Sequence, residues 1–214
     1  MLTPALIEAL QHIVGHGNLI KDPEEKLVYE CDGLTMFKAV PEVIVFPTST
    51  QQVADIVRLT HGAQVPFVAR GGGTGLSGGA LAVEGGIMIA LTKLRTILEI
   101  DLENQRVVVQ PGVVNLWITQ AVATQGYYYA PDPSSQQACT IGGNVAENSG
   151  GPHTLKYGVT TNHVLGLEMV LPDGQIIDTG GLAEDYPGYD LTGLMVGSEG
   201  TLGIVTKVIV RLMR

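Results

Sequence analysis

The sequence predicts an α+β fold of two lobes, a small parallel βαβ lobe over about residues 1–95 and a larger, mostly antiparallel lobe over about residues 96–214. Two observations predict this division. In the first part, short apolar runs alternate with a stretch of helical periodicity, which is the pattern of a βαβ unit. In the second part, apolar runs are separated by short polar turns, which is typical of β-hairpins. Helices are expected to flank the larger sheet.

Two helices are predicted before the first apolar strand. Thr3 and Pro4 have the chemistry of an N-cap followed by proline at the first helical position. The apolar residues that follow keep helical spacing, and Gly15–Asn18 would end the helix. The residues Asp22–Glu25 have a capping-box pattern, which opens a short second helix.

A βαβ unit is predicted next. Val43–Phe46 and Pro66–Ala69 have the composition of short buried strands, and Ser49–Gln52 opens a helix between them. Such a unit is expected to form a parallel pair with a right-handed crossover. Ile87–Leu91 adds a third buried strand.

The larger lobe is predicted from two hairpins, one helix and a last strand. Polar turns at 103–105 and 172–174 separate the strands of the two hairpins. Leu116–Thr124 has the pattern of a helix, and Trp117 is expected to pack inward. The predicted strands are Ile97–Leu102, Arg106–Gln110, Leu167–Leu171, Gln175–Asp178 and Gly203–Leu212.

Composition and charge exclude several classes of function. The net charge is −9, from 12 basic and 21 acidic residues, so nucleic acid and anionic membrane surfaces are poor partners. No apolar run reaches membrane-spanning length, and the N-terminus lacks the features of a signal peptide. Two widely separated cysteines do not make a disulfide framework, which favours a cytoplasmic location. Five histidines without metal-ligand spacing predict no metal site.

Glycine is the unusual component, with 28 of 214 residues gathered at 71–79, 142–151 and 197–203. Arg70–Gly79 directly follows a predicted strand, where consecutive glycines let backbone N–H groups converge on a phosphate. The alternative is a flexible surface loop. The other two clusters could each be ordinary turns, but three such segments in one chain suggest a long ligand held mainly by backbone.

Three nucleotide or hydrolase motifs can be weighed at this loop. Gly73, Gly75 and Gly78 match the dinucleotide fingerprint, and the spacing around Ser77 matches the nucleophile elbow of hydrolases. Both motifs need a helix directly after the loop, and the short stretch before the next strand leaves no room for one. A P-loop needs Gly-Lys, which this chain lacks. A phosphate-cradling loop without a following helix is therefore predicted.

These segments resemble the FAD-binding domain of the vanillyl-alcohol oxidase/PCMH flavoprotein family, in order and over nearly the whole chain. Within the family, the resemblance is closest to flavoprotein subunits of glycolate oxidases, followed by D-lactate and D-2-hydroxyglutarate dehydrogenases. The segments that carry it are Pro47–Val53, Arg70–Gly79, Ile141–Gly151, Lys156–Gly158 and Gly197–Thr206. The resemblance implies a PCMH-type fold in which two lobes clamp an extended FAD.

The resemblance also implies which residues hold FAD. The pyrophosphate would be held by the first loop, through Arg70, Gly71, Gly72, Gly73, Thr74, Gly75, Gly78 and Gly79. The ribityl chain and isoalloxazine would be lined by Pro131, Asp132, Ile141, Gly142, Gly143 and Asn144, with Ser149, Gly150, Tyr157 and Gly158 near the flavin or its phosphates. The adenosine end would be bordered by Glu199, Gly200, Gly203 and Ile204, with the Ile204 backbone as a partner for adenine.

Two departures from the family pattern matter. Members with covalent flavin carry a histidine near the position of Thr74, so noncovalent FAD is expected here. Members also continue into a cap domain that carries most substrate-binding groups, whereas this sequence stops at Arg214. We therefore expect the 214 residues to be the FAD-binding domain of a longer chain or of a complex with a separate cap, and no catalytic base is assigned.

A few other residues have competing interpretations. His12, His16 and His61 are expected to be solvated, while His153 could approach the flavin or make a structural hydrogen bond. Cys139 is interpreted as a small buried residue and not as a redox thiol. Tyr127–Tyr129 resembles a stacking platform, but core packing is favoured.

The resemblance implies a flavin-dependent dehydrogenase or oxidase for a 2-hydroxy acid, with hydride transfer from the α-carbon to flavin N5. Electrons would pass to a partner redox subunit (iron–sulfur or a second flavin type) or to a quinone. A location in the cytoplasm, with membrane contact only through such a partner, is expected. The alternative from another class is a noncatalytic FAD-binding module, or a paralogous subunit that supports another flavoprotein.

Overall fold

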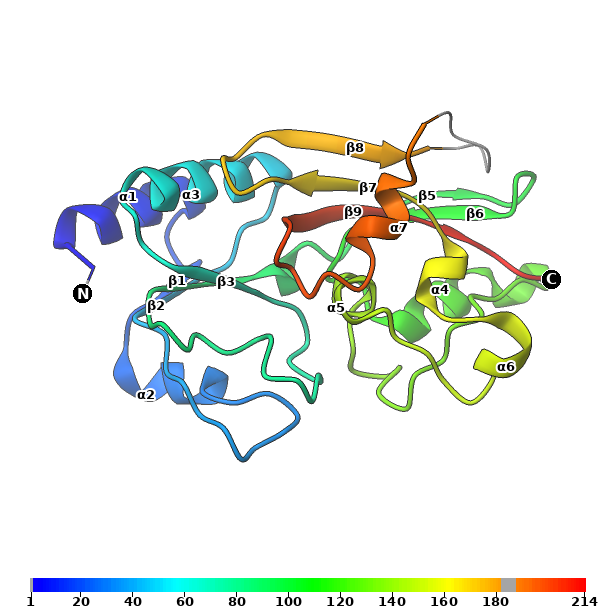
Figure 1. Cartoon of the computed structure of the whole chain (residues 1–214), viewed down its shortest axis with the longest axis horizontal. Helices are drawn as coiled ribbons and strands as arrows, with labels where there is room; N and C mark the ends of the chain where they lie inside the picture. The colour runs from blue at the N-terminus through cyan, green and yellow to red at the C-terminus, as the bar shows by residue number, and fades with distance from the viewer. Residues whose placement is uncertain (1, 182–187) are drawn as a thin grey trace.

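The computed structural model describes residues 2–181 and 188–214, and over these residues the strands form two separate sheets (Figure 1). The four-stranded sheet has the order β1-β2-β4-β3 and the five-stranded sheet has the order β5-β6-β9-β7-β8. The first contains the parallel strands and the second is antiparallel throughout. The predicted α+β class, with one parallel-containing and one antiparallel sheet, is therefore confirmed.

The four-stranded sheet contains the predicted βαβ segment with one correction. β2 (Val43–Val45) and β3 (Phe67–Arg70) are parallel members of one sheet, joined by α3 (Thr50–Gly62). They are not neighbours, because β4 (Ile87–Ala90) lies between them and pairs with both. Every residue of β4 is buried, which suits a central parallel strand covered on both faces. A short β1 (Leu19–Ile20) pairs antiparallel with β2 at the edge.

Two helices cover this sheet and form its core with it. α1 (Pro4–Val14) and α3 lie together on one side of the strands (Figure 1). The side chain of Thr3 caps α1 by accepting the Leu6 N–H, as the sequence predicts. Asp22 caps the short α2 (Pro23–Lys26), which continues as the 3₁₀ helix η1 (Leu27–Tyr29). The core residues include Leu10, Val14, Val45, Val53, Ile56, Val57, Ile87 and Ile89.

The five-stranded sheet confirms both predicted hairpins. They are β5 (Ile97–Asp101) with β6 (Arg106–Val109), and β7 (Val164–Val170) with β8 (Ile176–Gly180). The last strand, β9 (Ile204–Arg211), lies between β6 and β7. Its residues alternate between buried and half-buried, as the alternating β-branched pattern predicts for a strand with one core face.

Short helices pack beside the five-stranded sheet. They are α4 (Asn115–Val122), α5 (Ile141–Glu147), α6 (Thr154–Tyr157) and α7 (Leu191–Met195), with the 3₁₀ turns η3 (Ala123–Gln125) and η4 (Thr160–His163). A further 3₁₀ turn, η2 (Leu91–Lys93), follows β4, and its Leu91 belongs to the core of the four-stranded sheet. The expectation that Trp117 packs inward is wrong, since 41% of it is exposed. Ile118 and Val122, four residues apart on the opposite face of α4, are fully buried instead.

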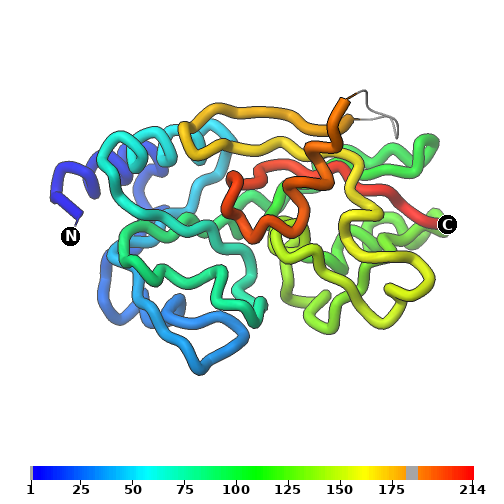
Figure 2. The backbone as a smooth tube through the Cα atoms, viewed as in Figure 1, coloured from blue at the N-terminus to red at the C-terminus, as the bar shows by residue number. Residues whose placement is uncertain are grey.

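The two sheets are joined through α3, the end of β7 and the start of β9. Val170 and Ile204 belong to the core of the four-stranded sheet although their strands belong to the other. The Glu168 carboxylate of β7 accepts hydrogen bonds from Thr50 of α3 and from Thr206 of β9. The backbone trace shows the glycine-rich segments running between the two sheets (Figure 2). None of the helices over the described residues has the length and apolar content that crossing a membrane requires.

Candidate functional site

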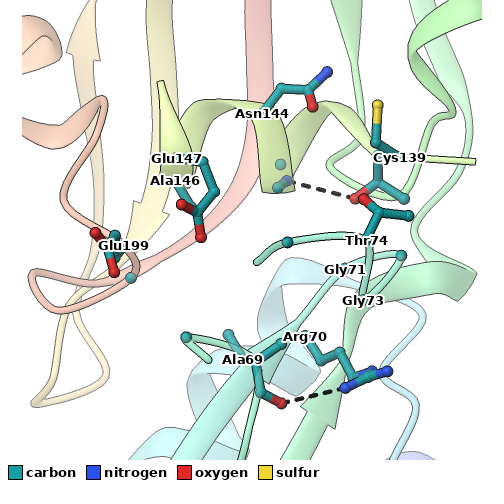
Figure 3. Close-up of a pocket in the computed structure, with 18 of the residues that line it drawn as sticks. Ala69, Arg70, Gly71, Gly73, Thr74, Cys139, Asn144, Ala146, Glu147 and Glu199 are labelled. Carbon is teal, nitrogen blue, oxygen red and sulfur yellow. Dashed lines mark hydrogen bonds between the residues drawn. The ribbon is translucent and has the colours of Figure 1, made fainter. Parts of the chain in front are cut away.

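A cavity of about 480 Å³ lies where the glycine-rich segments of the two sheets meet (Figure 3). Most of its wall comes from three stretches that are far apart in sequence, 69–80, 134–149 and 198–205, and Asp32, Leu91, Pro111 and Met195 complete it. The segment between β3 and β4 forms one side, α5 forms another, and the turn leading into β9 closes the third. The geometry therefore assembles all three glycine clusters around one space.

Most of the residues predicted to bind the cofactor line this cavity. They are Arg70, Gly71, Gly72, Gly73, Thr74, Gly75, Gly79, Gly142, Gly143, Asn144, Ser149, Glu199, Gly200, Gly203 and Ile204. The predicted residues outside its lining are Gly78, Pro131, Asp132, Ile141, Gly150, Tyr157 and Gly158. Ile141 is instead fully buried in the core of the larger sheet.

The first glycine loop runs from β3 to β4 without a helix, as predicted. Over the described residues, no hydrogen bond is donated by the backbone N–H of any residue from Gly72 to Ser77. Gly73 and Gly78 have φ of +66° and +77°, a backbone conformation that side chains disfavour. The loop thus presents a run of unused N–H donors at the cavity wall, which is the arrangement that binds phosphate.

The glycines are needed for protein packing as well as for access to the cavity. A Cβ on Gly71 would lie 2.4 Å from the Thr140 Oγ1, and one on Gly72 would lie 2.6 Å from the Ala138 carbonyl oxygen. Both distances are far below a van der Waals contact, so the loop approaches the segment before α5 as closely as backbone allows. Only glycine fits these two positions.

Arg70 holds the loop at the end where it leaves β3. Its guanidinium is buried, donates from Nη2 to the Cys31 carbonyl at 2.8 Å and from Nη1 to the Ala80 carbonyl at 3.4 Å, and lies 5.6 Å from the centre of the Tyr29 ring. Burial lowers the pKa of Arg70, which the Cys31 and Asp32 side chains oppose. Because Nη1 and Nη2 are engaged by carbonyls, the main role of Arg70 in the described structure is to hold the loop.

Asp32 holds the loop near its Gly79 end, and the sequence did not predict this residue. Its carboxylate accepts the Gly78 N–H at 2.9 Å and the Leu34 N–H at 2.8 Å, and it lines the cavity. Asp32 is buried and lies 46 residues from Gly78 in the chain. No local motif marks it, because the contact depends on the tertiary fold.

The first part of the second glycine cluster forms the helix α5 and not the turn that its glycines suggest, while Gly150 and Gly151 lie in the segment that follows the helix. Thr140 caps α5 by accepting the Gly143 N–H, and Ile141 and Val145 bury its inner face. Gly142 is required because its Cβ would lie 2.6 Å from Pro111. Asn144 lines the cavity, and its buried Nδ2 has no hydrogen-bond partner among the described residues.

The electrostatics of the cavity are dominated by acids. Asp32, Glu147 and Glu199 line it, whereas Arg70 is the one cation among the described lining residues. Figure 3 shows the side chains of Glu147 and Glu199 on the same side of the cavity. Burial and the neighbouring charges of Glu199 and Asp32 raise the pKa of Glu147, against a hydrogen bond from Ser77. The sequence did not predict that Glu147 and Glu199 lie on the same side of the cavity.

Asp132 and His153 form a separate pair, and neither residue lines the cavity, although Ser134 and Ser149 nearby in the sequence do. The His153 Nδ1 is hydrogen-bonded to one oxygen of Asp132, and the other Asp132 oxygen is buried without a partner among the described residues. A Cβ on Gly151 would lie 2.3 Å from the Asp132 carbonyl oxygen, so this turn is tightly packed. His153 therefore makes the structural hydrogen bond that the sequence left open.

The other residues singled out from the sequence lie as follows. His12, His16 and His61 are exposed, and Cys139 is buried at the cavity wall. Tyr129 is buried in the core, and Tyr127 packs against it from a half-buried position. Tyr157 contacts Tyr128 edge to face, with ring centres 6.2 Å apart. Within the described part of the chain, no three His, Cys, Asp or Glu residues are grouped so that they could hold a metal ion.

Comparisons with known proteins agree with this geometry. A family model described as "FAD binding domain" matches residues 41–180. The glycolate oxidase subunit GlcD of Escherichia coli is 48% identical over 99% of this chain and 42% of that protein. The D-lactate dehydrogenase of Anaerostipes hadrus is 41% identical over 99% of this chain and 45% of that protein. The chain thus spans less than half the length of these relatives.

A solved structure of alkyldihydroxyacetonephosphate synthase has the same fold, with a TM-score of 0.87 at 24% identity over 100% of this chain and 44% of that one. The family match covers well over half of the chain and includes the first two glycine clusters. The resemblance to PCMH-type flavoproteins predicted from the glycine segments is confirmed. This chain belongs to the family of FAD-binding domains, and its cofactor is FAD.

Proposed function

We propose that this chain is the FAD-binding part of a flavin-dependent oxidoreductase that oxidises a 2-hydroxy acid of the glycolate or D-lactate type. The observation that carries the proposal is the single cavity to which all three glycine clusters contribute. The names of relatives, glycolate oxidase subunit and D-lactate dehydrogenase, support the substrate class. Since those proteins are more than twice as long, the reaction itself is part of the proposal.

The residues present fit an extended dinucleotide. The loop Gly72–Ser77 offers backbone N–H groups that no protein atom accepts among the described residues, which suits the pyrophosphate. Asn144 lines the same cavity, and we place it beside the flavin or its ribityl chain. The turn Glu199–Ile204 closes the far end, where we place the adenosine.

The remaining predicted contacts belong to the same proposal. Pro131 and Asp132 come just before the lining residues Ser134 and Ser135, and Gly150 follows the lining residue Ser149. We place these residues beside the flavin ring, together with Tyr157 and Gly158. When bound, the flavin supplies the acceptor for the hydride that leaves the α-carbon. The chain itself supplies the rigid walls that fix the flavin's position and orientation.

We propose that FAD is held without a covalent bond. The family resemblance implies that a histidine for covalent attachment of flavin would stand near the position of Thr74. No histidine is found among the described residues that line the cavity. Acid precipitation of the purified chain should therefore release yellow flavin into the supernatant, and chromatography should identify it as FAD. Flavin that stays with the pellet would contradict noncovalent binding. Tighter binding of FMN or NAD than of FAD would contradict the assignment of the cavity.

A redox partner completes the proposed reaction. The name of the Escherichia coli relative identifies it as a subunit, which supports a complex with a second protein. We propose that electrons leave the flavin for such a subunit, carrying an iron–sulfur centre or a second flavin, or for a quinone. A cytoplasmic location, with membrane contact only through the partner, belongs to this proposal.

A further inference from the structure

The carboxylate of Glu147 lies against the loop that we assign to the pyrophosphate. Its Oε1 is 3.6 Å from the position of a Cβ on Gly75 and 3.7 Å from that of a Cβ on Gly79. Oε2 of Glu199 is 3.8 Å from the same Gly79 position, so both acids flank one glycine. The Ser77 hydroxyl is 3.4 Å from the Glu147 Oε2. Glu147 is therefore within reach of an anion that contacts the loop.

The charges around this loop do not suit an anion when every acid is ionised. Asp32, Glu147 and Glu199 face Arg70 as the one cation of the described lining, and Arg70 already serves two carbonyls. A bound dinucleotide adds the negative charges of its diphosphate to this group. Negative charges at short range raise the free energy of the state in which both the acids and the diphosphate are ionised. Protonation of one acid lowers that free energy.

Among the three acids, Glu147 is the one placed to donate to an anion on the loop. The Asp32 carboxylate is already engaged, because its two oxygens accept one backbone N–H each, from Leu34 and from Gly78. Glu147 and Glu199 are both exposed, but of the two it is Glu147 that accepts a hydrogen bond from the loop, donated by the Ser77 hydroxyl. A bound dinucleotide would cover Glu147 and remove water from it.

Resting on the proposed function, we propose that Glu147 takes up one proton from solvent when FAD binds, and that its O–H donates a hydrogen bond to a phosphate oxygen. One O–H bond forms on the carboxylate as one bond to hydrogen breaks in the hydronium ion or buffer acid that gives up the proton, and the cofactor keeps its redox state. Glu147 would then be a residue that binds the cofactor and makes its retention depend on pH. Burial, Glu199 and Asp32 already raise the pKa of Glu147 before any phosphate is added.

The sign of the pH dependence follows from linkage. The pKa of Glu147 is higher with FAD bound than without it, so the protonated form is favoured by binding. FAD affinity is therefore constant above the bound-state pKa, rises as the pH falls through it, and levels off below the pKa of the free protein. With one linked proton, the dissociation constant changes by about tenfold per pH unit at most.

The first test is isothermal titration of the flavin-free chain with FAD at pH 7, in two buffers of different ionisation enthalpy. We expect net uptake of a proton by the wild-type chain and none by Glu147→Gln, whose amide N–H donates without titrating. Glu103→Gln is the matched control, since Glu103 is exposed in the turn between β5 and β6. It should take up a proton as the wild type does.

The second test distinguishes hydrogen-bond donation from Glu147 to a phosphate oxygen from a simple loss of charge repulsion between the two groups. Between pH 5.5 and 8.5, FAD affinity should depend on pH in the wild type and be flat in Glu147→Gln and Glu147→Ala. At pH 5.5 the Ala variant should bind FAD more weakly than the wild type and the Gln variant, because it lacks the donor. Tight FAD binding without proton uptake, or equal affinity of the Ala and Gln variants throughout, would overturn this inference. A wild-type chain that binds no FAD would overturn the cofactor assignment instead.

Discussion

Gly72 is the residue at which packing and cofactor binding are most directly linked. Its Cβ position lies 2.6 Å from the Ala138 carbonyl oxygen, while its own N–H is one of the unused donors at the cavity. We expect Gly72→Val to push the loop away from the segment before α5. The strain of about 1–3 kcal/mol for such an overpacked site corresponds to about five- to 150-fold weaker FAD binding. Flavin fluorescence during titration measures this loss.

The matched control is Gly62→Val at the end of α3, where a Cβ meets nothing within 4 Å and φ is not positive. It should leave FAD affinity unchanged. Ser77→Ala should also have little effect, since the Ser77 hydroxyl makes only a long contact of 3.4 Å with Glu147. An esterase activity that disappears with Ser77→Ala would contradict this assignment and favour a hydrolase.

At this scale the sequence predicts the glycines and Glu199 and misses the other two acids. Clustered glycines mark places where side chains cannot be accommodated, and most of the clustered residues do line the cavity. Asp32 and Glu147 carry no comparable mark. Asp32 meets Gly78 across 46 residues and Glu147 meets Ser77 across 70, so their roles depend on how the sheets are placed.

The contact between elements that most clearly joins the two sheets is centred on Glu168. Its carboxylate accepts from Thr50 of α3 and from Thr206 and Lys207 of β9. We expect Glu168→Gln to lower the free energy of unfolding at pH 7 by about 1–2 kcal/mol, because the charge-assisted bond to Lys207 is lost. Urea denaturation measures the difference, with Glu99→Gln on the exposed face of β5 as the control.

The same contact predicts a pH dependence. Burial alone would raise the pKa of Glu168, but hydrogen bonds from Lys207, Thr50 and Thr206 outweigh it, so the pKa is lowered. A lowered pKa in the folded state gives stability that is full above the ordinary value near 4.5 and is lost as the pH falls through the folded value. The stability gap between wild type and Glu168→Gln should shrink over that range. A constant gap would show that the ionised carboxylate is not responsible.

Strands and hairpins were predictable because each follows from a local apolar pattern and its turn residues. The order of strands was not, since the apolar runs of β2, β3 and β4 are alike and only packing places β4 in the centre. α5 was hidden by Gly142 and Gly143, which lower helix propensity. Thr140 and the buried Ile141 and Val145 form the helix nonetheless. Tertiary contacts decided these cases.

On the scale of the whole molecule, the chain holds a cofactor site but few groups for a substrate. Among the described residues that line the cavity there is no histidine, lysine or tyrosine. Arg70, the one cation, is engaged by the carbonyls of Cys31 and Ala80. Oxidation of a hydroxy acid requires a base for the hydroxyl proton and a partner for the carboxylate. The cavity wall offers the carboxylates of Asp32, Glu147 and Glu199, but among the described lining residues it offers no free cation for the carboxylate of the substrate.

We therefore expect the 214-residue chain, fully loaded with FAD, not to oxidise glycolate or D-lactate at an enzymatic rate. Bound flavin alone lacks the orientation of the substrate on which most of the rate depends. Anaerobic stopped-flow mixing with millimolar hydroxy acid and no acceptor measures flavin reduction directly, and dithionite reduction confirms that the flavin is redox-active. Bleaching within seconds would place a substrate site within these residues. The pair Asp132–His153 beyond the cavity would then be the first base to test, and His153→Asn should abolish the bleaching while leaving FAD bound.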